Sequence, residues 1–410
     1  MPIFSSLMAI SITVSVLSII GFHFYFGNSY SKSTYDTRLT IPMRRSVSIR
    51  SSRDFHLFGH QSGFDCGSKF ALSCAECLQG NSALIDPTEC AGDCTLTDKS
   101  SSCVLKTQNP CNLNEYVHQL RSEELDITCD NIAELEIGDI TGRGWNRQVF
   151  EATWHGKTVA VKEIYFADAS DGKNDVLHEA AVLFQLRESE NVSKLIGLCK
   201  QRMVFEYAPT TLENLVVSNT KAISVKQALL LGLDAVKGVA QLHSIAGGPV
   251  AHNDIHLGQF LVNSMSRVLL SDFDNAKYAG FDTTGKKCLI EDKHGIYKPC
   301  SAPEKKMSRN NVNESSDIYE VALVLWALLA GEVPYQHLKE LDDYSAVNER
   351  ILAGERPDLS LISAYPQEMR ALIVEAWDGD PKKRPTASEL AIRMEDIVEK
   401  YVLKRQHDFR

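Results

Sequence analysis

The 410-residue sequence lacks a surplus of positive charge, with 43 Lys and Arg against 53 Asp and Glu and a formal net charge of −10. A nucleic-acid partner is therefore not expected, because no basic face is present to displace counterions from phosphates. The chain also has no internal repeat and no long low-complexity tract. Because 44% of its residues are hydrophobic, it can bury one large core or two ordinary ones.

Residues 7–26 contain no Lys, Arg, Asp or Glu. About twenty such residues are enough to cross a hydrocarbon core as a helix. A secretory signal peptide has a shorter apolar stretch, of about 7–15 residues, before a small-residue cleavage site. No clean A-x-A pattern follows here. We therefore predict an uncleaved signal anchor, a transmembrane helix over residues 1–27, with a cleaved signal peptide as the alternative, and a Ser/Arg-rich stem linker over residues 28–64.

Cysteine is concentrated in one stretch, residues 65–130. Eight of the eleven cysteines lie there, namely Cys66, Cys74, Cys77, Cys90, Cys94, Cys103, Cys111 and Cys129. An even, dense set with little apolar periodicity indicates a disulfide module in an oxidising compartment. Zinc is the alternative, because Cys74-Ala-Glu-Cys77 has metal-ligand spacing, although no His lies between Cys74 and Cys94.

Two signals disagree about orientation. Residues 28–54 carry six Lys and Arg against two Asp, and by the positive-inside rule this excess prefers the cytosol. The cysteines favour the lumen or the cell exterior, and N-x-S sequons at Asn191 and Asn313 are compatible with that side. We predict a single-pass type II membrane glycoprotein whose body faces the ER/Golgi lumen or the cell exterior, with a cytosolic-facing body as the alternative.

Strand-like and helical patterns alternate from residue 131 to residue 404. Residues 156–166 alternate with period two, as in a strand, and residues 174–189 have the apolar spacing of a helix. The run 318–331 is apolar all round and too short to span a bilayer, which predicts a helix buried in a helical lobe. Strands first and helices later predict an α+β body with a small β-rich lobe, 131–207, and a larger helical lobe, 208–404.

A glycine-rich stretch opens this body. Gly142 and Gly144 would let the backbone approach phosphate oxygens, and Val149 would cover an adenine ring. Arg147 stands where the G-x-G-x-x-G pattern has its third glycine, so the pattern is incomplete. The G-x-G pair taken alone fits an ordinary hairpin equally well.

A lysine on the next predicted strand is a candidate phosphate-binding residue. Lys162 lies in V-A-V-K, and Ala160 shares its face and leaves room for a base. Glu179, on the following helix, would pair with Lys162 and hold its ammonium toward the nucleotide phosphates. Glu206 and Ala208 follow the next strand, where their backbone groups could meet the adenine edge.

Residues that hold nucleotide phosphates meet one requirement of phosphoryl transfer. The reaction needs in addition a group that orients or deprotonates the acceptor hydroxyl, and ligands for a metal ion. Asp254, in H-x-D, is the candidate base, and Asp272, eighteen residues further on, is the candidate metal ligand. Gln259 offers an amide oxygen as a second ligand, and Mg²⁺ and Mn²⁺ prefer carboxylate and amide oxygens. His256 stands where phosphotransferases with this H-x-D pattern, the protein kinases, commonly have a Lys or Arg that touches the transferred phosphate. This resemblance implies that protonated His256 could do the same, which would make activity fall as the pH rises.

Taken together, V-A-V-K, H-x-D, D-F-D, A-P-E and K-K-R-P resemble the protein-kinase superfamily over residues 132–403. The segment 258–276, which combines Gln259 with D-x-D-x-A, is similar to secretory-pathway kinases of the protein O-mannose kinase and vertebrate lonesome kinase type. The resemblance implies the bilobal protein-kinase fold, with ATP and Mg²⁺ or Mn²⁺ as cofactors.

The resemblance also defines departures and scaffold roles. Asn253 replaces an arginine that usually pairs with an activation-loop phosphate, so activation by phosphorylation of that loop is not expected. Asp274 replaces the glycine of D-F-G, which predicts a less mobile segment. The family fold implies a buried ion pair between Glu304 and Arg384, and a carboxylate, Asp317, that braces the catalytic loop.

Three cysteines remain within the kinase-like body. Cys288 and Cys300 flank the activation segment, and our hypothesis is a disulfide between them that pins it. Cys199 is interpreted as a small buried hydrophobic residue.

The predicted function is that of an ATP-dependent kinase of the secretory pathway. It would transfer the γ-phosphate to a hydroxyl of a protein (Ser, Thr or Tyr) or of a glycan in the lumen, with the membrane as its N-terminal anchor. Two alternatives stay open. One is a pseudokinase that acts as a membrane-anchored binding scaffold, and the other is a cytosolic-facing enzyme of the tyrosine-kinase-like branch.

Overall fold

A computed structural model describes residues 94–97, 100–103, 111–144, 147–164, 170–217, 223–291, 300–307, 312–336, 338 and 344–407. The predicted anchor, the stem and most of the Cys-rich module lie outside these residues. The predicted localisation, a single-pass membrane protein, is contradicted: within the described ranges no helix is both long enough and apolar enough to cross a bilayer.

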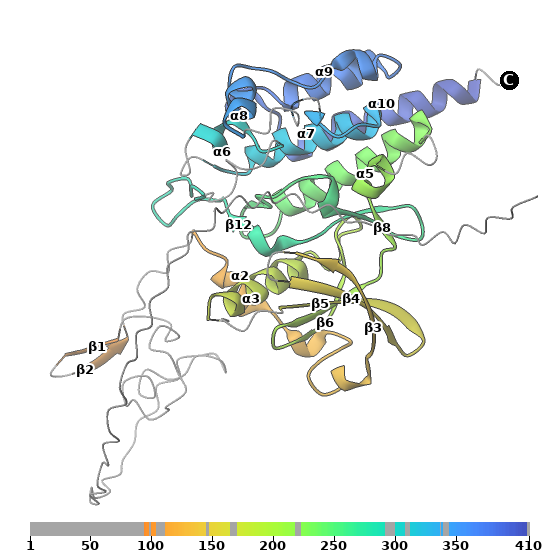
Figure 1. The fold of residues 1–410 in the computed structure, drawn as a ribbon. Coiled ribbons are helices and arrows are strands. Elements are labelled where there is room, and N and C mark those ends of the chain that lie inside the picture. Colours follow the sequence, from red (N-terminus) through yellow and green to blue (C-terminus); the bar gives the residue numbers. More distant parts are fainter. Residues whose placement is uncertain are drawn as a thin grey trace, which may run out of the picture. The chain divides into compact units, whose positions relative to one another are not determined.

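The smaller lobe is built on a five-stranded antiparallel sheet with the strand order β3-β4-β5-β7-β6 (Figure 1). Its strands are β3 (Glu136–Arg143), β4 (Arg147–Trp154), β5 (Lys157–Ile164), β6 (Leu195–Cys199) and β7 (Arg202–Glu206). The period-two pattern of β5 is confirmed. Val159 and Val161 are buried in an apolar cluster on one face, which leaves Lys162 on the other face.

Two helices accompany the sheet. Helix α3 (Ser170–Gln185) buries Val176, Ala180 and Leu183, the stripe expected from its helical spacing. Helix α2 (Asn114–Gln119) contacts α3 and buries Tyr116. The segment that holds α2 was predicted to belong to the Cys-rich module, but it packs on the two-lobed body.

The larger lobe is helical (Figure 1). Helix α5 (Val225–His243) contacts α7 (Ser315–Ala330), and α7 is buried from residue 316 to residue 329, which confirms the helix predicted from its apolar run. Among the described residues this lobe also contains the α-helices α4 (Leu212–Val217), α6 (Pro303–Met307), α8 (Tyr344–Leu352), α9 (Gln367–Ala376) and α10 (Ala387–His407).

Short strands frame the segments that carry the candidate site. β10 (Phe260–Val262) pairs with β11 (Val268–Leu270), and β9 (Val250–Ala251) pairs with β12 (Lys277–Tyr278). These two antiparallel pairs fix both ends of the segments 252–259 and 271–276. A short strand β8 (Thr210–Thr211) extends the first pair, and a separate hairpin joins β1 (Cys94–Thr97) to β2 (Ser100–Cys103).

Two disulfides cross-link the described chain. Cys111 is bonded to Cys288, and Cys129 is bonded to Cys199, with Cα–Cα distances of 5.4 Å and 4.8 Å. The hypothesis of a Cys288–Cys300 bond is therefore wrong, and so is the interpretation of Cys199 as a simple hydrophobic residue. The bonded cysteines are 177 and 70 residues apart in the sequence, and no local pattern specifies such pairings.

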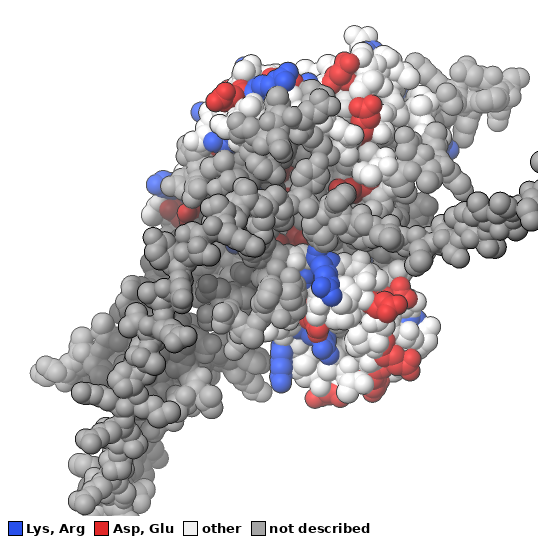
Figure 2. Space-filling model, viewed as in Figure 1, with Lys and Arg blue, Asp and Glu red and all other residues white. Residues whose placement is uncertain are grey.

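Surface charges of both signs are interspersed on the face of the described residues that Figure 2 shows. Elsewhere in the described chain, charged side chains form ion pairs between helices, and two examples are Lys237 with Glu395 at 2.6 Å and Arg393 with Glu375 at 2.7 Å. Exposed pairs of this kind contribute about 0.2–1 kcal/mol each. The buried apolar cluster of α5, α7, α9 and α10 is therefore the larger source of stability.

Candidate active site

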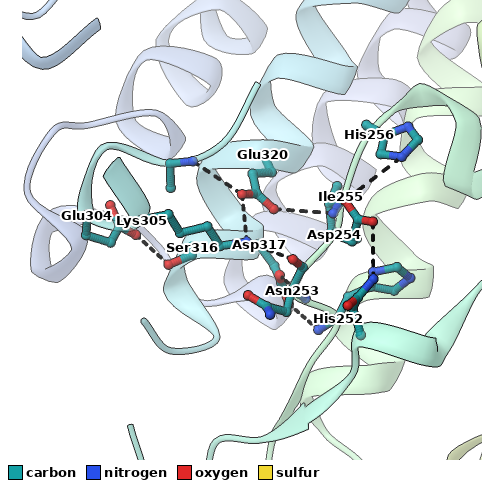
Figure 3. Close-up of polar contacts among 12 residues, drawn as sticks. His252, Asn253, Asp254, Ile255, His256, Glu304, Lys305, Ser316, Asp317 and Glu320 are labelled. Carbon is teal, nitrogen blue, oxygen red and sulfur yellow. Dashed lines mark hydrogen bonds and ion pairs between the residues drawn. The ribbon is translucent and has the colours of Figure 1, made fainter. Parts of the chain in front are cut away.

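The catalytic-loop segment is held by a carboxylate from α7 (Figure 3). Asp317 accepts hydrogen bonds from the backbone amides of His252 and Asn253, at 2.7 Å and 3.0 Å. Its Oδ2 also lies 2.9 Å from Nε2 of His243, on α5. The predicted bracing role of Asp317 is confirmed, and burial is tolerated because each of its oxygens is hydrogen-bonded.

The predicted buried ion pair of the larger lobe is also present. Arg384 donates from Nη1 and Nη2 to the two carboxylate oxygens of Glu304, at 2.7 Å and 2.8 Å. Ser316 donates to the same carboxylate at 2.6 Å. This fork-shaped geometry orients as well as attracts, so it fixes α6 against the segment that precedes α10.

Asp254 lies between three polar side chains. Its Oδ2 is 3.5 Å from Nε2 of Gln259 and 3.5 Å from Nδ2 of Asn275, and its Oδ1 is 4.0 Å from Nε2 of His256. The Asp254 side chain is 11% exposed. The structure thus brings together three of the predicted residues, and it adds Asn275, for which the sequence offered no signal beyond its place after D-F-D.

The lysine of β5 joins the two lobes. Lys162 donates to Oε1 of Glu179, on α3, at 2.7 Å, and it also makes an ion pair with Asp272, from the segment after β11. Burial lowers the pKa of Lys162, but the Asp272 and Glu179 carboxylates outweigh burial and hold it above its usual value. Burial raises the pKa of Asp272, and the Lys162 ammonium more than offsets this, so Asp272 is ionised at neutral pH.

Two of the departures from the kinase pattern meet in the same place. Arg147 is buried, with Nη1 3.2 Å from Oε2 of Glu179 and Nε 3.9 Å from Oδ2 of Asp274. Burial and the neighbouring Asp272 charge raise the pKa of Asp274 to about 7. Asn275 donates to Asp274 at 2.9 Å and also lies against Asp254. A continuous series of contacts, through Asp274 and Asn275, therefore links Arg147 to Asp254.

The remaining predicted nucleotide residues lie on, or directly follow, strands β3, β4, β5 and β7 of the smaller lobe. Val149 lies opposite Lys162 in the register of β4 and β5, so the two side chains share one face of the sheet. Gly142 pairs with Val149, and the amide of Gly144 donates to the carbonyl of Arg147 at 2.7 Å. Among the described contacts, none places Ala160, Glu206 or Ala208 beside the charged network around Lys162. Ala160 lies opposite Phe205 in the register of β5 and β7, and Glu206 is the last residue of β7 and is exposed.

His252 connects the catalytic loop to the Asp272 segment. Its Nε2 lies 2.9 Å from the carbonyl of Ser271. Burial lowers the pKa of His252, so the ring is neutral at neutral pH and its Nε2 must carry the proton that this contact requires. Ser271 also donates its amide and its hydroxyl to the carbonyl of Gln259, both at 2.9 Å. Asp272 itself has a left-handed backbone, with φ 65°.

A second buried ion pair, which the sequence patterns did not predict, lies beneath the catalytic loop. Lys305, on α6, is 1% exposed, and Glu320, on α7, is 2% exposed, with 2.8 Å between Nζ and Oε1. The only signal was a Glu inside a run that is otherwise apolar. A buried Glu in such a run needs a cation partner, which could have been sought among the lysines.

A network of this kind between a β-sheet lobe and a helical lobe is typical of phosphotransferases. Residues 135–394 match the family described as protein tyrosine and serine/threonine kinase. This match covers more than half of the chain, so the chain belongs to that family. The protein-kinase fold expected from the sequence is confirmed.

Several curated proteins are similar to this part of the chain. The probable serine/threonine-protein kinase drkC of Dictyostelium discoideum is 30% identical over 276 residues, which are 65% of this chain and 35% of drkC. The dual specificity protein kinase shkD of the same organism is 28% identical over 278 residues, 65% of this chain and 35% of shkD. The human serine/threonine-protein kinase TNNI3K is 25% identical over 279 residues, 65% of this chain and 32% of TNNI3K.

The chain thus spans about a third of the length of these relatives. None of the three carries the name of a protein O-mannose kinase or a vertebrate lonesome kinase. They support the broad resemblance and not the narrower one. Protein kinases use ATP and a divalent metal ion, and the described chain offers a carboxylate and an amide, Asp272 and Gln259, on adjoining segments tied together through Ser271.

Proposed function

We propose that this chain is an active protein kinase that transfers the γ-phosphate of ATP to a Ser, Thr or Tyr hydroxyl of a protein. One observation carries the proposal: Lys162 contacts Glu179 of the smaller lobe and Asp272 of the larger lobe at the same time. The phosphate-binding lysine and the metal-binding carboxylate must both be in place for phosphoryl transfer. A pure scaffold has no chemical need of this arrangement.

In the proposed reaction, Asp254 orients the acceptor hydroxyl and takes its proton as the hydroxyl oxygen bonds to the γ-phosphorus. The bond between that phosphorus and the bridging oxygen breaks, and ADP keeps the electron pair. His256, near Asp254, would contact the transferred phosphate when protonated. Lys162, oriented by Glu179, would hold the α- and β-phosphates. The hydrogen bond from Gln259 to Asp254 would limit the rotation of the carboxylate.

The proposed metal ligands are Asp272 and Gln259, which suit Mg²⁺ or Mn²⁺ because both ions prefer oxygen ligands. When bound, the ion neutralises charge on the phosphates. If Nε2 of Gln259 faces Asp254, its amide oxygen is the atom left for a cation. The residues proposed to contact the adenine and the phosphate backbone are Gly142, Gly144, Val149, Ala160, Glu206 and Ala208.

A protein acceptor is proposed because the named relatives are serine/threonine or dual specificity protein kinases. The dual specificity of shkD makes a mixture of Ser, Thr and Tyr peptides the appropriate first substrate.

The test measures both nucleotide binding and phosphate transfer by the purified chain. ATP with Mg²⁺ or Mn²⁺ should raise the melting temperature, and Lys162→Ala and Asp272→Ala should each abolish that shift. Asp254→Asn should keep the shift but lose transfer to the peptide mixture by about 100-fold or more. Lys157→Ala, an exposed lysine on the same strand, is the matched control. A folded chain that shows neither the shift nor transfer would instead be a binding scaffold.

A further inference from the structure

The Lys305–Glu320 ion pair lies at the junction of α6, α7 and the catalytic loop (Figure 3). Both charges are almost completely buried. Burying an ion pair gives little net stability, because desolvation of the two charges offsets their attraction. A pair of apolar side chains would serve the core equally well, so the position of this pair calls for an explanation other than stability.

The contacts of the pair converge on the peptide groups that flank Asp254. Lys305 donates to the carbonyl of Asn253 at 3.0 Å, and Oε2 of Glu320 accepts from the amide of Ile255 at 3.3 Å. One peptide group precedes Asp254 and the other follows it. The backbone on both sides of the candidate base is therefore held by a single ion pair.

The same ion pair also contacts the A-P-E motif, residues 302–304, where the activation segment ends. Oε1 of Glu320 accepts from the amide of Ala302 at 3.2 Å, and Lys305 belongs to the following helix. Thus residues 302–305, which include A-P-E, are fixed to the catalytic loop through Glu320. A displacement of this segment would be transmitted to the peptide groups around Asp254.

Asn253 shows why such support is needed. It has a left-handed backbone, with φ 66°, a conformation that costs about 1 kcal/mol or more outside glycine. Its amide is held by Asp317 and its carbonyl by Lys305. Because the peptide groups on both sides of Asn253 are fixed, the direction of the Cα–Cβ bond of Asp254, the next residue, is also fixed.

We propose that Lys305 and Glu320 are positioning residues, which orient Asp254 for proton transfer and couple it to residues 302–305. This inference rests on the proposed kinase activity, and it extends that activity to two residues outside the nucleotide site. Asn253 stands where kinases usually have an arginine that pairs with a phosphate on the activation loop. The internal pair orders the catalytic loop in place of such a phosphate.

The test separates positioning from folding. Lys305→Met and Glu320→Leu are combined, so that an apolar pair of similar volume replaces the ion pair and the chain remains folded. We expect kcat for peptide phosphorylation to fall about 10- to 100-fold, because small displacements of a catalytic group have effects of this size. The KM for ATP and the thermal shift with ATP should stay unchanged. A wild-type kcat in the double variant would overturn the proposal.

The matched control removes the Lys237–Glu395 pair, which joins α5 to α10 and is half-exposed, through Lys237→Met with Glu395→Leu. This control should keep the wild-type kcat. Amide hydrogen exchange gives a second readout that does not depend on activity. Ile255 loses its acceptor in the Lys305/Glu320 double variant, so its exchange should become at least tenfold faster, and unchanged protection would contradict the proposal. If the wild-type chain transfers no phosphate but the amide of Ile255 still exchanges faster in the double variant, the proposed kinase function fails. The coupling of the ion pair to the backbone around Asp254 would then still be supported.

Discussion

Arg147 and Asp274 stand at two positions where the kinase pattern has glycine, and they face each other in the folded chain. Arg147 is the cation that lies within 4.0 Å of Asp274, so its removal would leave that carboxylate without its close partner. Together with Lys162, Glu179 and Asp272 they form a set in which each carboxylate has a cation within 4.0 Å. We infer that the two departures are one compensated change rather than two independent losses.

This compensation predicts coupling between Arg147 and Asp274. Replacing Arg147 by Gly removes one of the two cations near Glu179 and should lower the free energy of unfolding by about 1–3 kcal/mol. Replacing Asp274 by Gly as well should restore part of that loss. Urea unfolding of the two single variants and the double variant forms a thermodynamic cycle, and we expect an interaction free energy of about 0.5–2 kcal/mol. Strictly additive losses would show that the two side chains do not interact.

Glu320 predicts a pH dependence of stability. Burial, only partly offset by Lys305, raises the pKa of Glu320 from 4.5 to about 7. The folded chain therefore holds a proton that the unfolded chain releases, so this contribution to the free energy of unfolding is full below about pH 4.5 and is lost as the pH rises to about 7. The difference in unfolding free energy between wild type and Glu320→Gln should fall between pH 5 and pH 7.5. A difference that is independent of pH would contradict the shift.

At the scale of elements, helix α5 supports the site through a close backbone contact. A Cβ on Gly238 would lie 2.6 Å from the carbonyl oxygen of Asn191 and 3.1 Å from Cβ of Leu270. That carbonyl accepts the amide of Leu270, at the end of β11 and two residues before Asp272. The glycine thus allows α5 to approach the strand that delivers Asp272 to the site.

Gly238→Ala should therefore destabilise the chain, although Ala favours helices over Gly by about 1 kcal/mol. The obstacle is a backbone carbonyl, and we expect a net loss of about 1–3 kcal/mol in urea unfolding. Gly232, on the same helix, is the matched control. A Cβ there would meet the ends of Leu325 and Met394, at 2.8 Å and 3.0 Å, and such flexible side chains can move. Equal losses for the two variants would count against this explanation.

Periodicity predicted the elements well where burial is one-sided or complete. The alternation in β5 and the apolar stripe of α3 each specify which face meets the core, and the structure has both. Helix α7 was predicted from its apolar run, but the same run concealed Glu320, whose partner Lys305 lies fifteen residues earlier on another helix. Patterns along one element carry no information about a charge supplied by a different element.

At the scale of the whole molecule, the sequence motifs placed Lys162, Glu179 and Asp272 in one site, and the fold brings these three together. The Cys288–Cys300 pairing was predicted wrongly, because cysteine pairing depends on which distant segments meet. Cys111 and Cys129 lie in a stretch interpreted as a separate module, yet both bond to the kinase body. The segment 111–130 is therefore part of the folded kinase unit.

These cross-links lead to the last prediction. The Cys111–Cys288 bond closes a loop of 177 residues, so it restricts the unfolded chain strongly. Cys111→Ser should lower the free energy of unfolding by about 2–5 kcal/mol under non-reducing conditions. Cys129→Ser, which opens the 70-residue loop to Cys199, should cost somewhat less, because loop entropy grows with the logarithm of length. In the presence of a reductant that breaks both bonds, wild type and variants should unfold at similar urea concentrations. A loss that persists in full after reduction would mean that the thiols stabilise the fold by packing rather than by cross-linking.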